Sequence, residues 1–316
     1  MRSDVDGVPG PSSFSGRWRL YFRERFPLAL HAAVVAVFSS SSFIYVWEVL
    51  GQRASPPAIS LTVAFIVTLL FFLQLRIADE FKDFEEDQRF RPYRPVPRGI
   101  VTLRGLGGLW IISAAVQTAS SALLGMRTLA ALAAVWAYFG LMAVEFFARK
   151  WLRAHPASYM ASHMLVLPLI VAYVATCAGL VTLSAPLLWL AGTSYFGFCV
   201  FEIGRKIRSP SDEEEGVETY SAVWGRQRAV LAWLGAMAGS GMFATLAARH
   251  VDALPLTAGV AAAVVFLAAG VGGTFLNDPR AGRGRMFFAI SGIWLVVIYL
   301  ALGAGAWRAL LADING

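Results

Sequence analysis

The sequence predicts an all-α integral membrane protein with nine transmembrane helices. Three observations support this fold class: charged residues are scarce, apolar runs have membrane-spanning length, and the cations are distributed to one side. Only 15% of the 316 residues are charged and 57% are hydrophobic, whereas a soluble domain carries about 25% charged residues. So few charges could not cover the surface of a soluble protein of this size. A water-soluble enzyme, a disordered chain and a disulfide scaffold are therefore disfavoured.

Nine apolar segments have the roughly 18–25 residues that a membrane-spanning helix needs. In chain order they cover approximately residues 28–50, 58–75, 101–125, 129–147, 158–180, 185–201, 229–248, 255–276 and 286–307. The strands of a membrane β-barrel would be about half this length. We therefore expect a short N-terminal segment over residues 1–27, followed by a single transmembrane domain over residues 28–316.

The boundaries between these segments contain residues that break helices, or charged loops. The breaking residues, in chain order, are Pro56-Pro57, Gly125, Pro156, Pro186 and Pro255. Long charged loops follow the second and sixth segments, and residues 277–280 are typical of a turn between the last two segments.

The cations predict the orientation of the chain. Of the 27 Lys and Arg residues, 23 fall in residues 1–27 or after the second, fourth, sixth and eighth segments. Because cytoplasmic loops are enriched in cations, we expect a multi-pass protein of the cell membrane with a cytoplasmic N-terminus and a C-terminus outside. The same bias explains the net charge of +7, so we expect no nucleic-acid partner. The first 25 residues are polar and lack the short apolar core of a signal peptide.

The acids gather on the same side as the cations, mainly in the two long loops. Asp79, Asp83 and Asp87 recur every four residues after the second segment, so a helix through them would place three carboxylates on one stripe. Like charges at this spacing repel each other, whereas a cation between them reverses the sign of the interaction. Mg2+ usually binds one or two carboxylates together with water and substrate phosphate oxygens. The stripe therefore predicts a magnesium–diphosphate site beside an apolar span.

An arginine- and proline-rich stretch follows this stripe. Its prolines prevent a continuous helix, and its arginines, Arg91, Arg94 and Arg98, return toward the carboxylates. The guanidinium group is suited to bidentate recognition of phosphate. Carboxylates, a divalent ion and guanidinium groups beside a membrane cavity indicate a site for an anionic head on a lipid tail.

The whole stretch resembles the first aspartate-rich motif of the UbiA superfamily of intramembrane prenyltransferases, N-D-x-x-D-x-x-x-D followed by R-P-x-R-P-x-x-x-G. Asp79 stands at the Asn position and Glu80 at the first Asp position. Asp83 and Asp87 match the next two aspartates. The second part of the motif is matched by Arg91-Pro92, Arg94-Pro95 and Gly99.

This resemblance implies a UbiA-like helical bundle around a central cavity that opens to the cytoplasmic side. It implies Mg2+ as the cofactor, with Asp79, Glu80, Asp83 and Asp87 as metal ligands. The expected reaction is transfer of a prenyl group from a prenyl or polyprenyl diphosphate to a hydrophobic acceptor, often an aromatic ring, with release of diphosphate. Arg91 and Arg94 are expected to bind that diphosphate. Membrane lipid is the other expected partner, and the oligomeric state is not predicted.

The loop after the sixth segment resembles only part of the family's second motif. Gly216 and Thr219 match its G-x-x-T piece, and Gly225 matches a later glycine. Asp212 matches the last aspartate, and Glu202 lies near another expected position. Asp212 and Glu202 are therefore two further candidate metal ligands.

The remaining aspartates of the second motif are missing, and Arg205, Lys206 and Arg208 occupy their neighbourhood. Replacing a carboxylate by a cation removes a metal ligand and adds a direct partner for phosphate. We therefore hypothesise a single metal held by Asp83 and Asp87, with Lys206 or Arg205 neutralising the rest of the diphosphate. Asp83, Asp87 and Lys206 are the predicted catalytic residues.

The loop after the fourth segment adds two more candidates for diphosphate binding, Arg149 and Lys150. They resemble a Lys-Arg pair of the family, although ordinary anchoring at the cytoplasmic face explains them equally well. Glu145 lies at the inner end of that segment, where an ionisable side chain is costly unless it is paired or faces a cavity. His163 in the fifth segment is more typical of a structural residue than of a substrate contact.

Three other functions stay open at this stage. The same superfamily contains enzymes that cyclise a prenyl diphosphate and enzymes that transfer phosphoribose to a polyprenyl phosphate, and the altered second motif is compatible with both. A lipid-binding or transport protein without catalytic activity is the third. It would show no metal-dependent diphosphate release and would tolerate replacement of Asp83.

Overall fold

The computed structural model describes residues 13–52 and 54–304, and every regular element within these ranges is a helix. The first elements are α1 (Phe14–Arg25), α2 (Leu28–Val49), α3 (Ala58–Lys82), α4 (Phe84–Phe90), α5 (Leu103–Ala122), α6 (Met126–Ala143), the 3-10 turn η1 (Glu145–Phe147) and α7 (Arg149–Ala154). The remaining elements are α8 (Pro156–Met164), α9 (Val166–Cys177), α10 (Ala185–Gly204), η2 (Pro210–Asp212), α11 (Tyr220–Val223), α12 (Arg226–Ala248), α13 (Leu254–Asn277) and α14 (Gly284–Leu302).

Eight stretches of the described chain are long and apolar enough to cross a membrane, as expected of a multi-pass membrane protein. They are α2, α3, α6, the α8–α9 pair, α10, α12, α13 and α14. The remaining predicted segment, residues 101–125, forms α5, a helix of 20 residues. Arg104, Gln117 and several glycines and serines make α5 less apolar than the other eight. It packs along α3 and α6, and the Gln117 amide donates a hydrogen bond of 3.2 Å to the carbonyl oxygen of Val67 in α3.

The fifth predicted segment is divided at Leu165 into α8 and α9. Pro168 lies three residues after the break and has no backbone N–H to donate to the carbonyl of Met164, as a continuous helix would require. The two halves have different neighbours, because α8 contacts α7 and α10 whereas α9 packs on α2, α3, α6 and α10.

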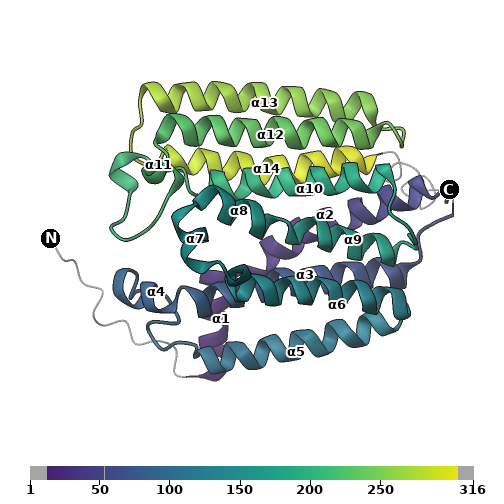
Figure 1. The fold of residues 1–316 in the computed structure, drawn as a ribbon, viewed down its shortest axis with the longest axis horizontal. Coiled ribbons are helices and arrows are strands. Elements are labelled where there is room, and N and C mark those ends of the chain that lie inside the picture. The colour runs from purple at the N-terminus through teal and green to yellow at the C-terminus, as the bar shows by residue number, and fades with distance from the viewer. Residues whose placement is uncertain (1–12, 53, 305–316) are drawn as a thin grey trace.

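The long helices run side by side, and α4, α7 and α11 lie together at one end of the bundle (Figure 1). Within the bundle, two tryptophans join helices that are distant in sequence. Trp233 of α12 donates to the Ser291 hydroxyl of α14 (2.9 Å), and Trp294 of α14 donates to the Ser240 hydroxyl of α12 (3.2 Å). Interhelical hydrogen bonds of this kind contribute about 0.6–2 kcal/mol each in a membrane. The pairs therefore hold α12 and α14 in register.

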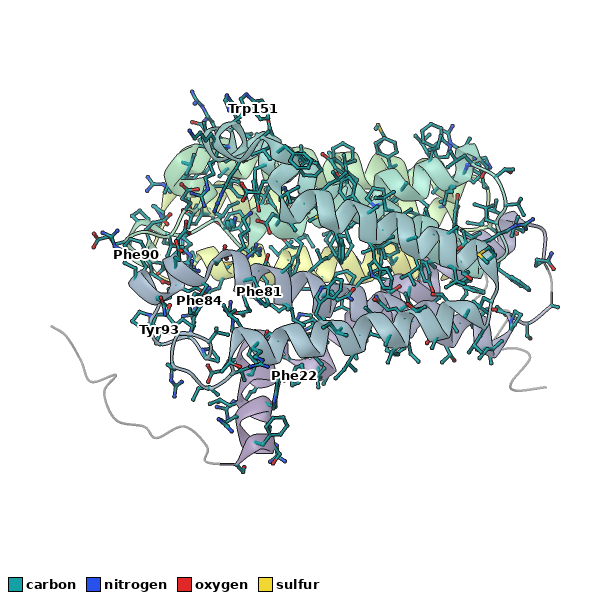
Figure 2. All side chains as sticks on the ribbon, turned by 60° about the horizontal axis from the view of Figure 1, so that its bottom comes forward. Phe22, Phe81, Phe84, Phe90, Tyr93 and Trp151 are labelled. Atoms are coloured by element: carbon teal, nitrogen blue, oxygen red, sulfur yellow. The ribbon has the colours of Figure 1, made fainter. Side chains whose placement is uncertain are left out.

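The first helix lies across the long helices (Figures 1 and 2). Ser13 caps α1 by accepting a hydrogen bond of 3.1 Å from the backbone N–H of Gly16. Tyr21 and Phe26 are buried against Leu73 and Ile77 of α3, while arginines cover the exposed side. This combination of arginines and aromatic residues is also found in helices that lie in a membrane interface. The predicted segment 1–27 thus packs on the bundle from α1 onward, and its residues 1–12 lie outside the described residues.

Candidate functional site

The two long charged loops meet at the end of the bundle that carries α4 and α11 (Figure 1). The Tyr93 hydroxyl of the first loop donates a hydrogen bond of 3.2 Å to Glu214 of the second loop. The Phe90 ring packs against Gly216, whose φ of +73° lies in the left-handed region, and a Cβ at Gly216 would overlap that ring. Figure 2 shows Phe90 and Tyr93 at this end of the molecule. Segments far apart in the sequence therefore form one surface.

The acidic stripe crosses the junction between α3 and α4. Asp83 lies between the two helices with φ −90° and ψ 4°. The helical hydrogen bonds nevertheless continue, from Asp83 N–H to the Asp79 carbonyl (2.9 Å) and from Asp87 N–H to the Asp83 carbonyl (2.8 Å). The three aspartates therefore keep roughly the one-turn spacing that their sequence positions predict.

Glu80 is buried and is held by two arginines. One of its carboxylate oxygens lies 2.6 Å from Nε of Arg25 in α1 and 3.0 Å from Nη2 of Arg76. The Glu80 side chain is 1% exposed. The structure thus places this candidate metal ligand in an ion-pair network that faces α1.

Asp87 is also buried between two arginines. Its carboxylate accepts two hydrogen bonds from Nη1 of Arg94, at 2.9 and 2.7 Å, and lies 2.9 Å from Nε of Arg91. Arg91 and Arg94 were the candidate diphosphate ligands of this loop. In the structure their side chains clamp the last aspartate of the stripe.

Asp79 and Asp83 have fewer cationic partners. Asp79 is half-exposed, and its carboxylate lies 3.6 Å from Nη1 of Arg76. Asp83 makes no ion pair with another described residue. Burial raises the pKa of the Asp83 carboxyl above its ordinary value, and the carboxylates of Asp79 and Asp87 raise it further. Negative charge at this point of the stripe is therefore unfavourable without an added cation.

The donor set fits a metal that is shared with substrate. Among the described residues, no three His, Cys, Asp or Glu side chains converge to hold a metal ion by themselves. Asp79 and Asp83 supply two carboxylates one helical turn apart, and a divalent cation would relieve the unfavourable charge at Asp83. Mg2+ commonly keeps one or two protein carboxylates and takes its other ligands from water and phosphate. These two residues can hold Mg2+ in that manner.

The end of α10 brings two cations to the same end of the bundle. Nε of Arg205 lies 2.5 Å from one oxygen of Glu202, and Nζ of Lys206 lies 3.0 Å from the other. The Lys206 ammonium also lies 5.2 Å from the ring centroid of Tyr220. Both oxygens of Glu202 are thus paired, while Arg205 and Lys206 keep part of their side chains exposed.

Asp212 has a different position from the other candidate ligands. Its carboxylate accepts a hydrogen bond of 2.7 Å from the backbone N–H of Gly282, in the loop between α13 and α14. In the same loop as Asp212, Arg208 pairs with Glu214 at 2.8 Å. Thr219 caps α11 by accepting from the N–H of Ala222 (3.1 Å). The Asp212 contact thus joins the second loop to the loop between α13 and α14, and the Thr219 contact stabilises the start of α11.

A pocket of about 940 Å³ lies beside the acidic stripe, between α3, α5, α6, η1 and α8. Its lining includes the aromatic residues Phe81, Phe84, Trp110, Trp136, Phe139 and Tyr159. Asp79 and Arg149 line the same pocket. Figure 2 shows Phe81 and Phe84 at the end of the bundle that carries α4. An apolar molecule in this pocket would therefore have its polar end close to the carboxylates.

The buried Glu145 forms an ion pair with the partly exposed Lys82 in the wall of this pocket. Lys82 Nζ lies 3.1 Å from Glu145 Oε1 and hydrogen-bonds to the Tyr159 hydroxyl. The paired, cavity-facing position that the sequence required of Glu145 is the one observed. His163 also lines the pocket, with Nδ1 2.8 Å from the Tyr159 carbonyl. Lys150 is exposed on α7.

Comparison of the sequence with known protein families identifies the family of this chain. The model of the UbiA prenyltransferase family matches residues 40–292, which include both charged loops and the pocket. The chain belongs to the UbiA prenyltransferase family. The resemblance inferred from the first aspartate-rich motif is thereby confirmed. A comparison with curated proteins gives no match.

Solved UbiA structures share the fold of this UbiA family member. A ligand-free UbiA homologue from Aeropyrum pernix K1 is 18% identical with a TM-score of 0.62, and the match covers 88% of this chain and 98% of that one. A structure reported for digeranylgeranylglyceryl phosphate synthase is 14% identical with a TM-score of 0.58, over 92% and 99% of the two chains. A UbiA homologue from Archaeoglobus fulgidus bound to DMAPP and Mg2+ is 11% identical with a TM-score of 0.56, over 89% and 98%.

Three residues of this candidate site were not among the sequence-based candidates: Arg25, Lys82 and Tyr159. Lys82 carried a usable signal, since it is the one cation inside the run of acids from Asp79 to Asp87. Arg25 and Tyr159 carried none, because their partners lie 55 and 77 positions away in the chain.

Proposed function

We propose that this UbiA family member is a Mg2+-dependent prenyltransferase, which moves the prenyl group of a prenyl diphosphate to a hydrophobic or aromatic acceptor and releases diphosphate. The supporting observation is the Asp79–Asp83 pair: Asp79 has one arginine 3.6 Å away and lines a pocket with aromatic walls, and Asp83 makes no ion pair with another described residue. The ligands of the Archaeoglobus fulgidus homologue, DMAPP or GPP with Mg2+, support the same substrate class and cofactor.

In the proposed reaction, the bond between C1 of the prenyl group and a diphosphate oxygen breaks. C1 then bonds to the acceptor, which releases a proton. Bound Mg2+ would neutralise charge that develops on the leaving diphosphate. Asp79 and Asp83 would hold this ion. The motif also offers Glu80 and Asp87 as ligands. These two residues would act mainly by anchoring the segment that carries Asp79 and Asp83, through ion pairs with their arginine partners.

The diphosphate itself requires cations that are free to reach it. Lys206 and Arg205 are held at the end of α10 by Glu202 and remain partly exposed. Arg149 lines the pocket, and Lys150 follows it on α7. These four would bind the oxygens that Mg2+ does not cover, because charge-assisted hydrogen bonds to phosphate are among the strongest in proteins. A single metal with cationic partners fits a second loop in which Arg205, Lys206 and Arg208 stand near the positions of the missing aspartates.

The proposed topology has nine spans, with α5 as the span that is less apolar than the rest. Its 20 residues reach about 30 Å at 1.5 Å per residue, and it packs along two neighbouring spans. The loops that carry α4, α7 and α11 would face the cytoplasm, where the cavity would open. The N-terminus would then lie in the cytoplasm, the C-terminus outside, and the transmembrane domain would extend from residue 28.

The proposed function is tested by diphosphate release from purified protein in detergent with Mg2+. The donors are dimethylallyl, geranyl and longer prenyl diphosphates and phosphoribosyl diphosphate, each with and without phenolic and lipid acceptors. Prenyl transfer predicts release that depends on an acceptor and a prenylated product. Asp83→Asn should abolish release, whereas Glu86→Gln, an exposed carboxylate on α4, should not.

Each other function predicts a different result. A cyclase would release diphosphate without an acceptor and yield a cyclic hydrocarbon. A phosphoribosyl transferase would use only phosphoribosyl diphosphate with a polyprenyl phosphate. Absence of release from every donor would contradict an enzymatic role and favour a lipid-binding or transport protein.

A further inference from the structure

Glu145 is a buried carboxylate that is not itself among the residues proposed to bind the metal or the diphosphate, and it lies next to Arg149, which is. It is 4% exposed, and its two oxygens have different surroundings. Oε1 lies 3.1 Å from Lys82 Nζ, whereas Oε2 has no hydrogen-bond partner among the described residues. Nε of Arg149 lies 3.8 Å from Oε2, beyond hydrogen-bonding distance. Buried carboxylate oxygens are normally satisfied, so Oε2 requires a donor from elsewhere.

The backbone at Glu145 adopts an uncommon conformation. Glu145, Phe146 and Phe147 have φ values of 50°, 53° and 58°, in the left-handed region that residues other than glycine rarely occupy. The turn buries the Glu145 side chain and packs Phe146 against Tyr138 and His163, while Phe147 is 84% exposed. Residues held in such conformations cluster at binding and active sites. The turn therefore keeps one carboxylate in the wall of the pocket.

The pocket that Glu145 lines offers aromatic surfaces and a few polar groups to a bound molecule. Aromatic side chains from α3, α4, α5, α6 and α8 line it together with aliphatic ones. The indole N–H of Trp136 in that wall also has no hydrogen-bond partner among the described residues. An unpartnered acceptor and an unpartnered donor thus line one cavity. Asp79 lines it too, so a molecule bound there lies beside the proposed metal–diphosphate site.

We propose that this pocket is the acceptor site, and that Glu145 Oε2 accepts a hydrogen bond from a hydroxyl group on an uncharged acceptor with a flat apolar body. Its role as an acceptor site rests on the proposed prenyl transfer, whereas the binding itself rests on the geometry of the pocket. Lys82 neutralises Glu145, so the wall carries no net charge from this pair. A carboxylate in the ligand would meet Glu145 directly, and an ether in place of the hydroxyl would leave Oε2 without a donor.

The test compares 2-naphthol with 2-methoxynaphthalene, in which a methyl group replaces the hydroxyl hydrogen. Equilibrium dialysis of full-length protein in detergent, corrected with protein-free micelles, measures the saturable binding of each probe without any prenyl diphosphate. We expect the wild-type protein to bind 2-naphthol at least tenfold more tightly than the ether. In the double variant Lys82→Met with Glu145→Leu, the preference should fall to less than twofold while binding of the ether stays within twofold of wild type.

The double variant is chosen because replacing both partners of a buried ion pair by apolar residues usually preserves the fold, whereas removing one partner leaves a buried charge. Glu86→Gln, on the exposed side of α4, is the matched control and should keep the full preference for 2-naphthol. Equal affinity of the wild-type protein for the two probes would overturn the proposal. A preference that persists in the double variant would overturn it as well.

The same proteins separate this inference from the proposed function. If 2-naphthol binding depends on Glu145 but no donor releases diphosphate, the pocket is a ligand site and the prenyl-transfer proposal fails. If diphosphate is released and transferred but the hydroxyl preference is absent, the transferase proposal stands and the role assigned to Glu145 fails.

Discussion

Arg25 of α1 and Glu80 of α3 form an ion pair of 2.6 Å that joins α1 to the helix in which the acidic stripe begins. Both side chains are shielded, at 12% and 1% exposure, and Arg76 donates to the same Glu80 oxygen at 3.0 Å. Glu80 occupies an aspartate position of the UbiA motif. In this chain that position anchors α1, so the docking of α1 and the geometry of the neighbouring Asp79 are coupled.

Removing Arg25 should therefore destabilise the protein. Breaking a buried ion pair by deleting one partner costs roughly 3–5 kcal/mol, and Arg76 retains part of the interaction with Glu80. We expect Arg25→Ala to lower the free energy of unfolding by about 2–3 kcal/mol, measured as a fall in the thermal midpoint of the purified protein in detergent. Arg23→Ala is the matched control, because Arg23 is 75% exposed and lies 3.9 Å from its partner Glu24. Equal thermal midpoints for the two variants would show that the Arg25–Glu80 ion pair does not stabilise the fold.

The last two aspartates of the stripe, Asp83 and Asp87, should respond differently to neutralisation. Asp83 makes no ion pair with another described residue, so Asp83→Asn should leave the thermal midpoint unchanged or raise it. If Asp83 holds Mg2+, kcat for diphosphate release should fall by about 10²–10³-fold, the usual loss when one stabiliser of transition-state charge is removed. Asp87→Asn should instead lower stability by about 3 kcal/mol, because Arg91 and Arg94 lose a buried partner. Similar stability losses for both variants would contradict this division of roles.

The fold was largely predictable from the sequence because membrane spans obey a length and polarity rule. Eight of the nine predicted segments are confirmed as apolar helices of membrane-spanning length. The interruption at Leu165 was not predicted, although Pro168 is visible in the sequence, because proline in a membrane helix is also compatible with a mere kink. The helical content of residues 14–25 was missed because arginines and aromatic residues at an interface produce no apolar run.

The residue types of the site were predictable, but their partners were not. A four-residue spacing places Asp79, Asp83 and Asp87 on one stripe in any helix. It does not say that Asp87 is clamped by two arginines while Asp83 makes no ion pair within the described part of the chain. That difference depends on how the chain returns after α4 and on where α1 docks. The same holds for Glu145, for which the sequence required a partner but did not identify Lys82.

Lys206 provides a test of direct cationic binding of the diphosphate. Hydrogen bonds to charged groups contribute about 1.5–3 kcal/mol, so Lys206→Gln should raise KM for the prenyl diphosphate by roughly ten- to a hundredfold. Lys206→Asp replaces this cation by a carboxylate, so diphosphate charge that Lys206 neutralised would have to be neutralised by additional Mg2+. The Mg2+ concentration needed for half-maximal activity should therefore rise. Arg153→Asp, a charge reversal on α7, is the control. A Mg2+ dependence unchanged in Lys206→Asp would sink the single-metal arrangement.

Gly216 tests whether contact between the two loops matters for activity. It has φ +73° and lies against the Phe90 ring, whereas Gly99 has nearly the same φ, +72°, and open space around the position of a Cβ. Both Gly216→Ala and Gly99→Ala incur the backbone cost of a left-handed alanine, about 1–2 kcal/mol. Only Gly216→Ala must also displace Phe90 from the second loop, so it should lose more stability and raise KM for the prenyl diphosphate as the loops separate. Matching thermal midpoints and KM values for the two alanine variants would show that the loops act independently, whereas partial recovery in Gly216→Ala combined with Phe90→Leu would identify the ring contact as the cause.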